Sequence, residues 1–335
     1  MPVERKRPGS GPAVPGTIIK DKGTLVAPTT PLDLPPEFRG LFLGDTGSGK
    51  STQLAELCLH LGTTGEGLTS VVMLADKGSM GPYRPLVKAG LTKVYAYDPA
   101  IDPWIWIGHA VKGEAKVDGK WVKVVEPGRD GLMVGEGLTA FSELLMMDMA
   151  RLSAEDPSKA IGGEAAWTHE ARDGDEVAKV SGSTRSHYGL AQLRIMNEIH
   201  RTDPGVASFW TAALQRSTDD IGSGGILSAE VAGKAMGPKI PRWFDRIFRI
   251  NAEATKGSAV HTLYLETHLD KLAKNAKAMS NARLSLRGAE VAPVPSSFQP
   301  ADLVQALLQI QRRDLAAVTE ITSARQAFLK AKGEK

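Results

Sequence analysis

A glycine-rich stretch near residue 44 limits the possible folds more than any other part of the chain. It reads Gly44-Asp45-Thr46-Gly47-Ser48-Gly49-Lys50-Ser51 and matches the pattern G-x-x-x-x-G-K-[ST]. The apolar residues 41–43 before it predict a strand, and the leucines of residues 54–61 after it recur at helical spacing. A flexible Gly/Ser turn that matches by chance is the weaker interpretation, because both flanking elements are correct. The stretch therefore predicts a phosphate-binding loop in an α/β fold.

The residue types in this loop suit a nucleoside triphosphate and its metal ion. Glycines let successive backbone N–H groups converge on an anion, and the following helix adds the positive end of its dipole. We expect Lys50 to bridge the outer phosphates and Ser51 to offer its hydroxyl to Mg²⁺. The chain has no N-K-x-D motif for guanine, so ATP and Mg²⁺ are the expected cofactors. The expected binding residues are Gly44, Asp45, Thr46, Gly47, Ser48, Gly49, Lys50, Ser51 and Thr52.

Acidic residues follow two of the predicted strands. Asp76 comes after the run 69–75, and Glu136 comes after the run 131–135. Parallel strands end at the same edge of a sheet, so both carboxylates are expected near the loop. Such a site needs an acid that holds Mg²⁺ through water and a group that positions the attacking water. The alternative for each residue is a plain solvated loop acid.

Short apolar runs alternate with helical patterns through most of the chain. Residues 40–99 read as strand, helix, strand, helix and strand, which is typical of a parallel sheet with helical crossovers. Further strands are predicted at 131–136, 206–214, 246–253 and 261–267, and helices at 139–152 and 187–200. The predicted fold class is α/β, with a P-loop NTPase core at 37–270 built on a mostly parallel central sheet.

Two insertions interrupt the predicted core. Residues 103–130 contain an alternating stretch, 108–126, around Asp118-Gly119, and this dipeptide is a strong signal for a β-hairpin. Residues 153–186 are polar and glycine-rich with almost no periodicity. They are expected to form either a mobile loop or a segment that a partner orders.

Both ends of the chain are basic, whereas its middle is mildly acidic. The net charge of only +3 excludes a histone-like coat of positive charge. Residues 1–36 are rich in Pro, Gly and Thr and predict a flexible basic arm. Residues 271–335 predict a basic extension with an amphipathic helix at 301–330, packed on the core or on a neighbouring subunit. This charge pattern suits contact with nucleic acid and ordinary solvated tails equally.

Cysteine content and hydropathy predict a cytoplasmic protein. Cys58 is the one cysteine, which excludes an internal disulfide, and its helical surroundings predict a small buried side chain. No stretch reaches the roughly 18 apolar residues that span a bilayer, and residues 1–12 lack the apolar part of a signal peptide. We therefore expect no membrane partner.

The order of these motifs resembles RecA-like ATPases. The likeness covers roughly residues 38–268 and is strongest with the short phage-encoded RecA-like proteins of the Sak type, which assist single-strand annealing and recombination. It rests on the segments 44–51, 71–99 and 131–145 and on a late block, FWTAALQRSTDD at 209–220 followed by GGILSAEVAGKAMGPKIPRWFDRIFRI at 224–250. In this family, the first half of the block is a strand that ends in a sensor of the terminal phosphate. The second half is a DNA-facing loop that returns to a strand.

The resemblance assigns roles to single residues. Asp76 resembles the carboxylate that activates the attacking water. Gln215 resembles the phosphate sensor, with Thr211 as the alternative. Glu136 takes the magnesium-side position, where the family usually has Asp before Ser-Leu-Thr. Glutamate is one methylene longer, so this departure bears on the rate of hydrolysis.

RecA-like subunits complete their sites across an interface, where a cation from the next protomer stabilises charge on the transferring phosphoryl group. Lys234, Lys239 and Arg242 lie in the matching loop, and they suit this role or contact with solvent or DNA phosphates equally. Trp243 and Phe244 precede a predicted strand, and we interpret them as core rather than as side chains that stack on bases.

These features lead to one main hypothesis and one alternative. The hypothesis is a Mg²⁺-dependent RecA-like protein that binds and hydrolyses ATP and acts on single-stranded DNA in phage or bacterial recombination, annealing or repair. Its expected partners are single-stranded DNA, further copies of the chain in a ring or filament, and a single-strand binding protein or another phage protein. The alternative is a nucleotide-dependent assembly or loading factor for a protein partner, which uses residues 153–186 and the C-terminal helix.

Overall fold

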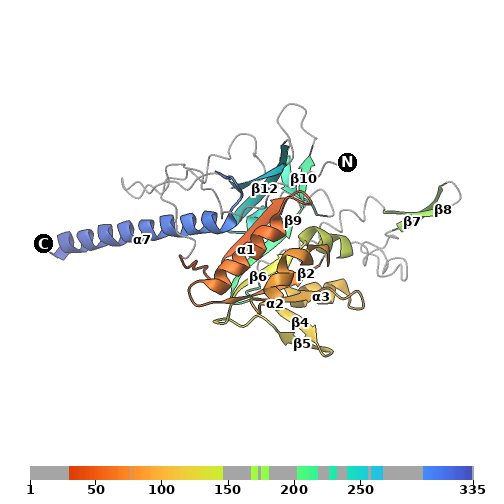
Figure 1. Cartoon of the computed structure of the whole chain (residues 1–335), viewed down its shortest axis with the longest axis horizontal. Helices are drawn as coiled ribbons and strands as arrows, with labels where there is room; N and C mark the ends of the chain where they lie inside the picture. Colours follow the sequence, from red (N-terminus) through yellow and green to blue (C-terminus); the bar gives the residue numbers. More distant parts are fainter. Residues whose placement is uncertain are drawn as a thin grey trace, which may run out of the picture.

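A central sheet organises the computed structural model of the chain (Figure 1). The structure describes residues 30–75, 77–145, 167–172, 175–180, 202–217, 226–231, 240–255, 258–266 and 297–333. The sheet has eight strands in the order β14-β13-β12-β1-β9-β6-β2-β3. Their bounds are β1 Arg39–Gly44, β2 Thr69–Leu74, β3 Thr92–Ala96, β6 Asp130–Glu136, β9 Ala207–Ala212, β12 Arg246–Thr255, β13 Ser258–Glu266 and β14 Ser297–Phe298.

Six neighbouring strands of this sheet run parallel. β1 lies between β12 and β9, and β6, β2 and β3 follow β9 outward. β13 and β14 complete the opposite edge in antiparallel pairing. The carboxyl ends of the six parallel strands therefore meet at one edge of the sheet. At that edge, β9 alone separates the end of β1 from the end of β6.

Helices connect the strands, and one of them leaves the sheet. The described helices are α1 Lys50–Thr63, the 3₁₀ helix η1 Lys77–Tyr83, α2 Arg84–Lys88, α3 Pro103–Ala110, a helix over residues 138–145, the 3₁₀ helix η3 Ile240–Trp243 and α7 Leu303–Gly333. α7 begins against α1 and then extends beyond the sheet as one long rod (Figure 1). Within the described residues, no helix combines the length and the apolar character needed to cross a bilayer.

Both faces of the sheet are covered, as a parallel sheet requires. Alternate residues of β1 point to opposite faces, so Leu41 and Leu43 join one apolar cluster and Phe42 joins the other. α1 and the first turns of α7 cover the face of Phe42, whereas α3 and the helix over 138–145 cover the other face. Cys58 of α1 is fully buried as predicted, and burial raises the pKa of its thiol to about 12.

Three short antiparallel pairs lie outside the central sheet. They are β4 Glu114–Val117 with β5 Lys120–Lys123, β7 Trp167–Arg172 with β8 Asp175–Val180, and β10 Leu214–Ser217 with β11 Ile226–Ala229. Asp118 and Gly119, both with positive φ, form the β4–β5 turn, which confirms the predicted hairpin. β7 and β8 form a hairpin inside 153–186, which was predicted to be either a mobile loop or a segment that a partner orders. Each strand has only six residues, and their apolar residues do not alternate regularly, so the sequence carries no clear strand signal.

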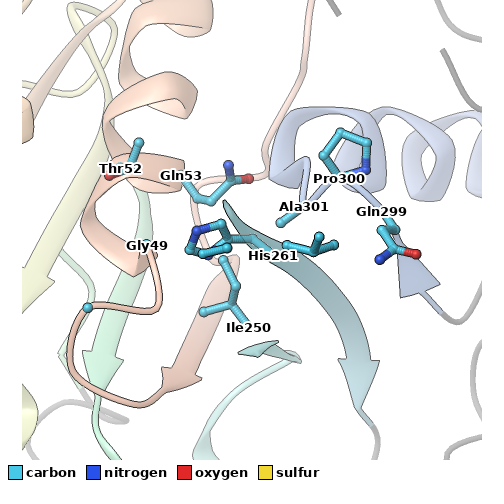
Figure 2. Close-up of a pocket in the computed structure, with 11 residues that line it drawn as sticks. Gly49, Thr52, Gln53, Ile250, His261, Gln299, Pro300 and Ala301 are labelled. Atoms are coloured by element: carbon cyan, nitrogen blue, oxygen red, sulfur yellow. The ribbon is translucent and has the colours of Figure 1, made fainter. Parts of the chain in front are cut away.

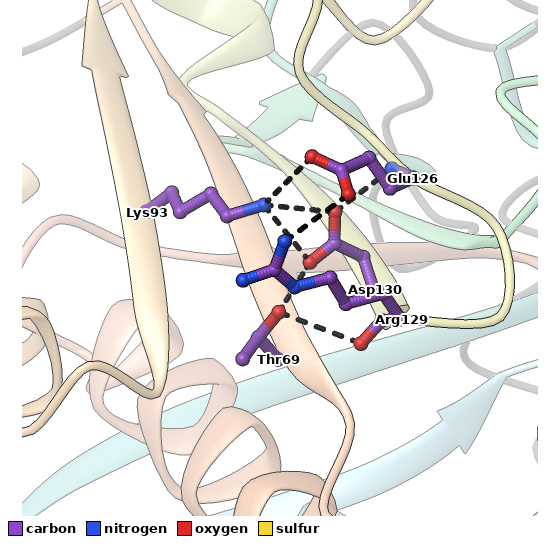
Figure 3. A network of polar contacts seen from close by, with 5 residues as sticks. All are labelled: Thr69, Lys93, Glu126, Arg129 and Asp130. Carbon is purple, nitrogen blue, oxygen red and sulfur yellow. Dashed lines mark hydrogen bonds and ion pairs between the residues drawn. The ribbon is translucent and has the colours of Figure 1, made fainter.

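The amino-terminal end of β6 carries a buried carboxylate in a polar network (Figure 3). Asp130, which is 2% exposed, accepts hydrogen bonds from the Thr69 hydroxyl and, at 2.8 Å, from the backbone N–H of Glu126. Lys93 Nζ lies 3.3 Å from Asp130 and 3.8 Å from the Glu126 carboxylate, which also pairs with Arg129 at 3.3 Å. The network joins the starts of β2, β3 and β6, at the sheet edge opposite the glycine-rich loop.

The predicted α/β fold class is confirmed: the chain has a mostly parallel central sheet, a β-hairpin insertion and a C-terminal helix. Two boundaries differ from the prediction. Residues 30–36, assigned to the arm, pack on the core, where Leu32 is buried and the backbone N–H of Asp33 donates to Gln311 of α7. Residues 103–110 form α3 rather than hairpin, because Asp102 caps the helix and Pro103 starts it.

The two helices predicted at 139–152 and 187–200 lie partly or wholly outside the described residues. The first is described to residue 145 and is helical there. The second lies outside the described residues.

Candidate functional site

The glycine-rich loop folds as the motif predicts. β1 ends at Gly44, α1 begins at Lys50, and the Ser48 N–H donates to the Asp45 carbonyl at 3.1 Å. Gly47 and Gly49 have φ of 77° and 97°, values that side chains rarely tolerate. A Cβ on Gly44 would lie 2.6 Å from Ser48 Oγ. The glycines are therefore needed for the tight loop that places backbone N–H groups at the start of α1.

Lys50 begins α1 beside this loop and is half-buried. Its Nζ donates to the carbonyl oxygens of Gly44 at 2.6 Å and Asp45 at 3.0 Å. Burial lowers the pKa of Lys50, and the negative charges of Glu136 and Asp45 oppose that shift. The ammonium group is thus held at the mouth of the loop by carbonyl oxygens, which an anion can replace.

Glu136 ends β6 beside the loop and is 1% exposed. Its Oε1 accepts from the Tyr83 hydroxyl at 2.5 Å, and its Oε2 accepts from the Thr211 hydroxyl at 2.8 Å. The Ser51 hydroxyl is a third donor. Burial raises the pKa of Glu136, whereas these three hydroxyl groups and the charge of Lys50 lower it. Burial also raises the pKa of Tyr83 well above its ordinary value, so its hydroxyl stays protonated and donates.

Two threonines hold the ends of β6 and β9 together. Thr211 Oγ1 donates to Glu136 and accepts from the Gly137 N–H at 2.8 Å. Thr139 Oγ1 accepts from the Ala213 N–H at 2.9 Å and donates to a backbone carbonyl at residue 230. Because β9 lies between β1 and β6, these bonds place Thr211 between the loop and the Glu136 carboxylate.

A cavity of about 640 Å³ opens over these groups. The loop from Thr46 to Thr52 lines one side, and Glu136, Thr211 and Glu143 line the other. Ser48 Oγ is buried and, among the described residues, has no hydrogen-bond partner. The donor set fits an anion bound together with Mg²⁺, since backbone N–H groups and Lys50 favour the anion and hydroxyl and carboxylate oxygens suit Mg²⁺.

A second cavity of about 650 Å³ lies on the other side of the same loop and shares Gly47, Gly49 and Thr52 with the first (Figure 2). His261 of β13 stands at its centre, with Nδ1 2.8 Å from the Ser48 carbonyl oxygen. Because a carbonyl oxygen only accepts, Nδ1 carries the proton. The two cavities therefore flank the same loop.

The segment that leads into α7 closes the far side of this second cavity. Gln53 of α1 accepts the Leu303 N–H through Oε1 at 2.7 Å, and the Ala301 N–H donates to the His261 carbonyl at 2.8 Å. Gln299 and Pro300 line the wall before α7 (Figure 2). The C-terminal helix is thus attached directly to the loop helix.

The structure brings several of the predicted residues together. Lys50, Ser51, Glu136 and the alternative sensor Thr211 all line the first cavity, with the loop residues around them. Gln215 lies in β10 opposite Ser228, and the structure describes its backbone but not its side chain.

Other predicted residues lie beyond what the structure describes. These are Asp76, Lys234 and Lys239, together with the side chain of Arg242, whose backbone belongs to η3. The neighbouring Phe244 is buried and Trp243 packs against the same apolar cluster, which confirms both as core residues.

Sequence reasoning missed Tyr83 and His261. Tyr83 ends a 3₁₀ helix, GPY, with no periodicity to mark it, and contacts Glu136 across 53 positions of sequence. His261 reaches the loop only because β13 returns antiparallel beside β12, which pairs with β1. The sequence around each residue carries no motif, so neither contact had a signal.

No family model matches the chain, and none of the curated proteins matches its sequence. Solved structures do match. One is a KaiC-like protein from the hyperthermophilic archaeon Pyrococcus horikoshii OT3, with 11% sequence identity and a TM-score of 0.33, covering 73% of this chain and 88% of that chain. Because the identity and the TM-score are this low, the likeness carries no argument about the chain. The interpretation of the site rests on the strand order and on the geometry of the loop.

Proposed function

We propose that the protein binds ATP with Mg²⁺, hydrolyses it, and acts on single-stranded DNA in phage or bacterial recombination, annealing or repair. The observation that carries the nucleotide part is the meeting of Lys50, Ser51 and Glu136 in one cavity beside the glycine-rich loop. A cation, a hydroxyl and a carboxylate in this setting are what a triphosphate and its metal ion need. The DNA part is supported by the resemblance of residues 209–250 to the Sak-type proteins.

The loop side of the first cavity holds the phosphates in this proposal. Backbone N–H groups and the N-terminus of α1 favour the anion, and Lys50 exchanges its carbonyl partners for phosphate oxygens. Ser51 and Glu136 hold Mg²⁺, directly or through water, and the ion supplies charge neutralisation at the phosphates. Tyr83 and Thr211 keep the Glu136 carboxylate in place.

The remaining steps need a sensor, a base and a cation in trans. Thr211 lines the cavity and contacts Glu136, which supports it as the sensor, whereas Gln215 rests on the resemblance. Asp76 as the group that activates water rests on the resemblance too. So does the cation from a neighbouring subunit, for which Lys234, Lys239 and Arg242 are the proposed sources.

The second cavity receives the nucleoside half of ATP in this proposal. It shares the loop glycines with the phosphate side, and His261, Gln299 and Pro300 line it with ring and amide surfaces. His261→Ala is expected to weaken ATP binding about tenfold while inorganic tripolyphosphate binds as before, measured by calorimetric titration. An equal loss for both ligands would place the effect of His261 on the loop rather than on the base.

The experiment that tests the whole proposal is ATP hydrolysis with Mg²⁺, measured with and without single-stranded DNA. Wild type is compared with Lys50→Ala and with the matched control Lys88→Ala, an exposed lysine of α2. Single-stranded DNA should raise ATP turnover in wild type and in the control. Lys50→Ala should abolish ATP turnover with or without DNA.

Binding of ATP without any response to DNA would contradict the DNA part of the proposal. The assembly or loading factor for a protein partner would then become the better description. Absence of ATP binding in wild type would contradict the nucleotide part as well.

A further inference from the structure

The apolar stripe of α7 continues after the helix leaves the core. Leu303, Leu307 and Ile310 are buried in the first turns at spacings of four and three. The same face continues with apolar side chains that are all exposed, namely Leu315, Val318, Ile321, Phe328 and Leu329. An amphipathic helix with an uncovered apolar face over several turns is the usual sign of an interaction surface.

A groove of about 540 Å³ lies at the point where α7 leaves the core. Its floor is apolar, and Leu315 and Val318 of α7 form one wall, so the groove opens on the same face as the exposed stripe. Its lining residues include the carboxylates of Asp33, Glu37, Asp245 and Asp314 and, as the one cation, Arg246, which lies 4.0 Å from Asp314. The groove is therefore apolar at its base and negative at its rim.

The last turns of α7 have the opposite charge. Residues 321–333 carry Arg325, Lys330 and Lys332 and no acidic residue. Phe328 and Leu329 stand among these cations and are 60% and 54% exposed. The tip of the helix thus offers apolar side chains within a positive surround, which complements the groove at the base of the same helix.

We propose that this surface binds a second copy of the chain. The two α7 helices pack antiparallel along their apolar stripes, and the tip of each lies in the groove at the base of the other. A two-fold interface of this kind needs one self-complementary patch, and tip and groove are the two halves of such a patch. The proposal adds an assembly surface to the protein and does not depend on the nucleotide bound.

The length of the helix agrees with this arrangement. Leu315 and Leu329 are 14 residues apart, which is about 21 Å along an α-helix. With the two-fold axis near residue 322, Leu315 of one copy faces Leu329 of the other. Phe328 then comes to the groove that Leu315 and Val318 of the other copy border.

Sedimentation velocity over a dilution series of the full chain tests the interface. Wild type should be dimeric at micromolar concentration, and Phe328→Glu at the tip and Val318→Glu at the groove should each raise the dissociation constant more than tenfold. Ser323→Glu adds the same charge to an exposed position off the stripe and should leave it unchanged. All three positions are exposed, so each variant should fold as wild type does, which circular dichroism checks.

Charge exchange tests the tip-in-groove contact separately. Lys332→Glu and Asp33→Lys should each weaken the dimer, and the double variant should recover most of the loss because the two charges meet again across the interface. An oxidative crosslink supplies the register: Leu315→Cys with Leu329→Cys in one chain should give a covalent dimer. Either single cysteine variant should not, since the equivalent residues lie about 21 Å apart in the antiparallel pair, and Cys58 is fully buried.

A wild-type chain that stays monomeric throughout the dilution series would overturn the proposal. So would a dimer that is indifferent to Phe328→Glu and Val318→Glu, or a double charge variant without recovery. If instead these variants abolish binding to DNA, to lipid vesicles or to another protein while the chain is monomeric, the face has a different partner and the proposal fails.

Discussion

Strand β6 carries a buried carboxylate at each end, and the two are held in different ways. Asp130 at its start has an ammonium group, a backbone N–H and a hydroxyl as partners (Figure 3). Glu136 at its end has three hydroxyl groups, while Lys50 nearby points to carbonyl oxygens of the loop. The two carboxylates are almost equally buried, at 2% and 1% exposure, so burial does not explain the difference.

The difference separates a structural carboxylate from one that is ready to bind. A buried carboxylate with a cation and a backbone donor beside it already has its partners, and removal of one member of such a set is costly to stability. A buried carboxylate that is held only by hydroxyl groups is less stable as an ion. Burial accordingly raises the pKa of Glu136. Hydroxyl groups can rotate toward another ligand, so Glu136 is the carboxylate of β6 that suits the metal-side role proposed above.

The largest expected effect is that of Asp130→Ala on stability. Removal of the carboxylate leaves the Thr69 hydroxyl and the Glu126 N–H without their shared acceptor, and the free energy of unfolding should fall by about 2–4 kcal/mol. Urea unfolding followed by circular dichroism measures this. The exposed Glu66→Ala is the control and should stay within about 0.5 kcal/mol of wild type. ATP affinity of the folded variant should be that of wild type.

Glu136→Gln should have the opposite profile. Turnover should fall about 10- to 100-fold, as is usual when a residue that orients a metal ligand is changed. Stability at neutral pH should not fall, because the variant no longer buries a charge. A clear loss of stability with full turnover would reverse the assignments of the two ends of β6.

The stability difference between Glu136→Gln and wild type should depend on pH. Burial raises the pKa of Glu136 above its ordinary value of 4.5, so the folded protein holds a proton that the unfolded chain releases. The contribution of this group to stability is fully present below pH 4.5 and is lost as the pH rises through the raised pKa. The stability of Glu136→Gln relative to wild type should therefore increase over that window and then level off.

Tyr83→Phe should have an intermediate effect on both stability and turnover. The variant removes the donor 2.5 Å from Glu136 Oε1 without changing the buried ring, and should cost about 1–2 kcal/mol. Loss of a donor to the ionised carboxylate raises its pKa further, so the acid limb of the turnover profile should move to higher pH. Tyr95→Phe in β3 is the matched control and should leave the profile in place.

Much of this site could be predicted from sequence, because its central parts are local. The strand, the glycine loop and the helix are continuous in the chain, and Glu136 is the last residue of an apolar strand. The insertion of β9 between β1 and β6 could not be predicted in the same way, because strand order depends on how separate segments pack. That order is what brings Thr211 to Glu136.

Contacts between residues that belong to no sequence motif or periodic pattern could not be predicted. Asp130 precedes the predicted strand 131–136, and its partners Thr69 and Lys93 come from two other strands at positions set by the register of the sheet. Residues 30–36 have the composition of a flexible arm, yet Leu32 and Leu34 give them enough apolar surface to pack on the cluster that α1 and α7 share. Composition over a window hides such single anchors.

The smallest expected effect, that of Lys93→Met, decides which partner of Asp130 matters. The Lys93 side chain is 31% exposed, so solvent screens its charge, and its loss leaves Asp130 with the Thr69 hydroxyl and the Glu126 N–H. We expect a cost of about 1 kcal/mol or less, shrinking in high salt. A cost equal to that of Asp130→Ala would mean that the ion pair carries the whole network. A small cost would mean that the neutral donors hold Asp130. Among the contacts described, the main difference between the two carboxylates of β6 would then be that Asp130 accepts a backbone N–H and Glu136 does not.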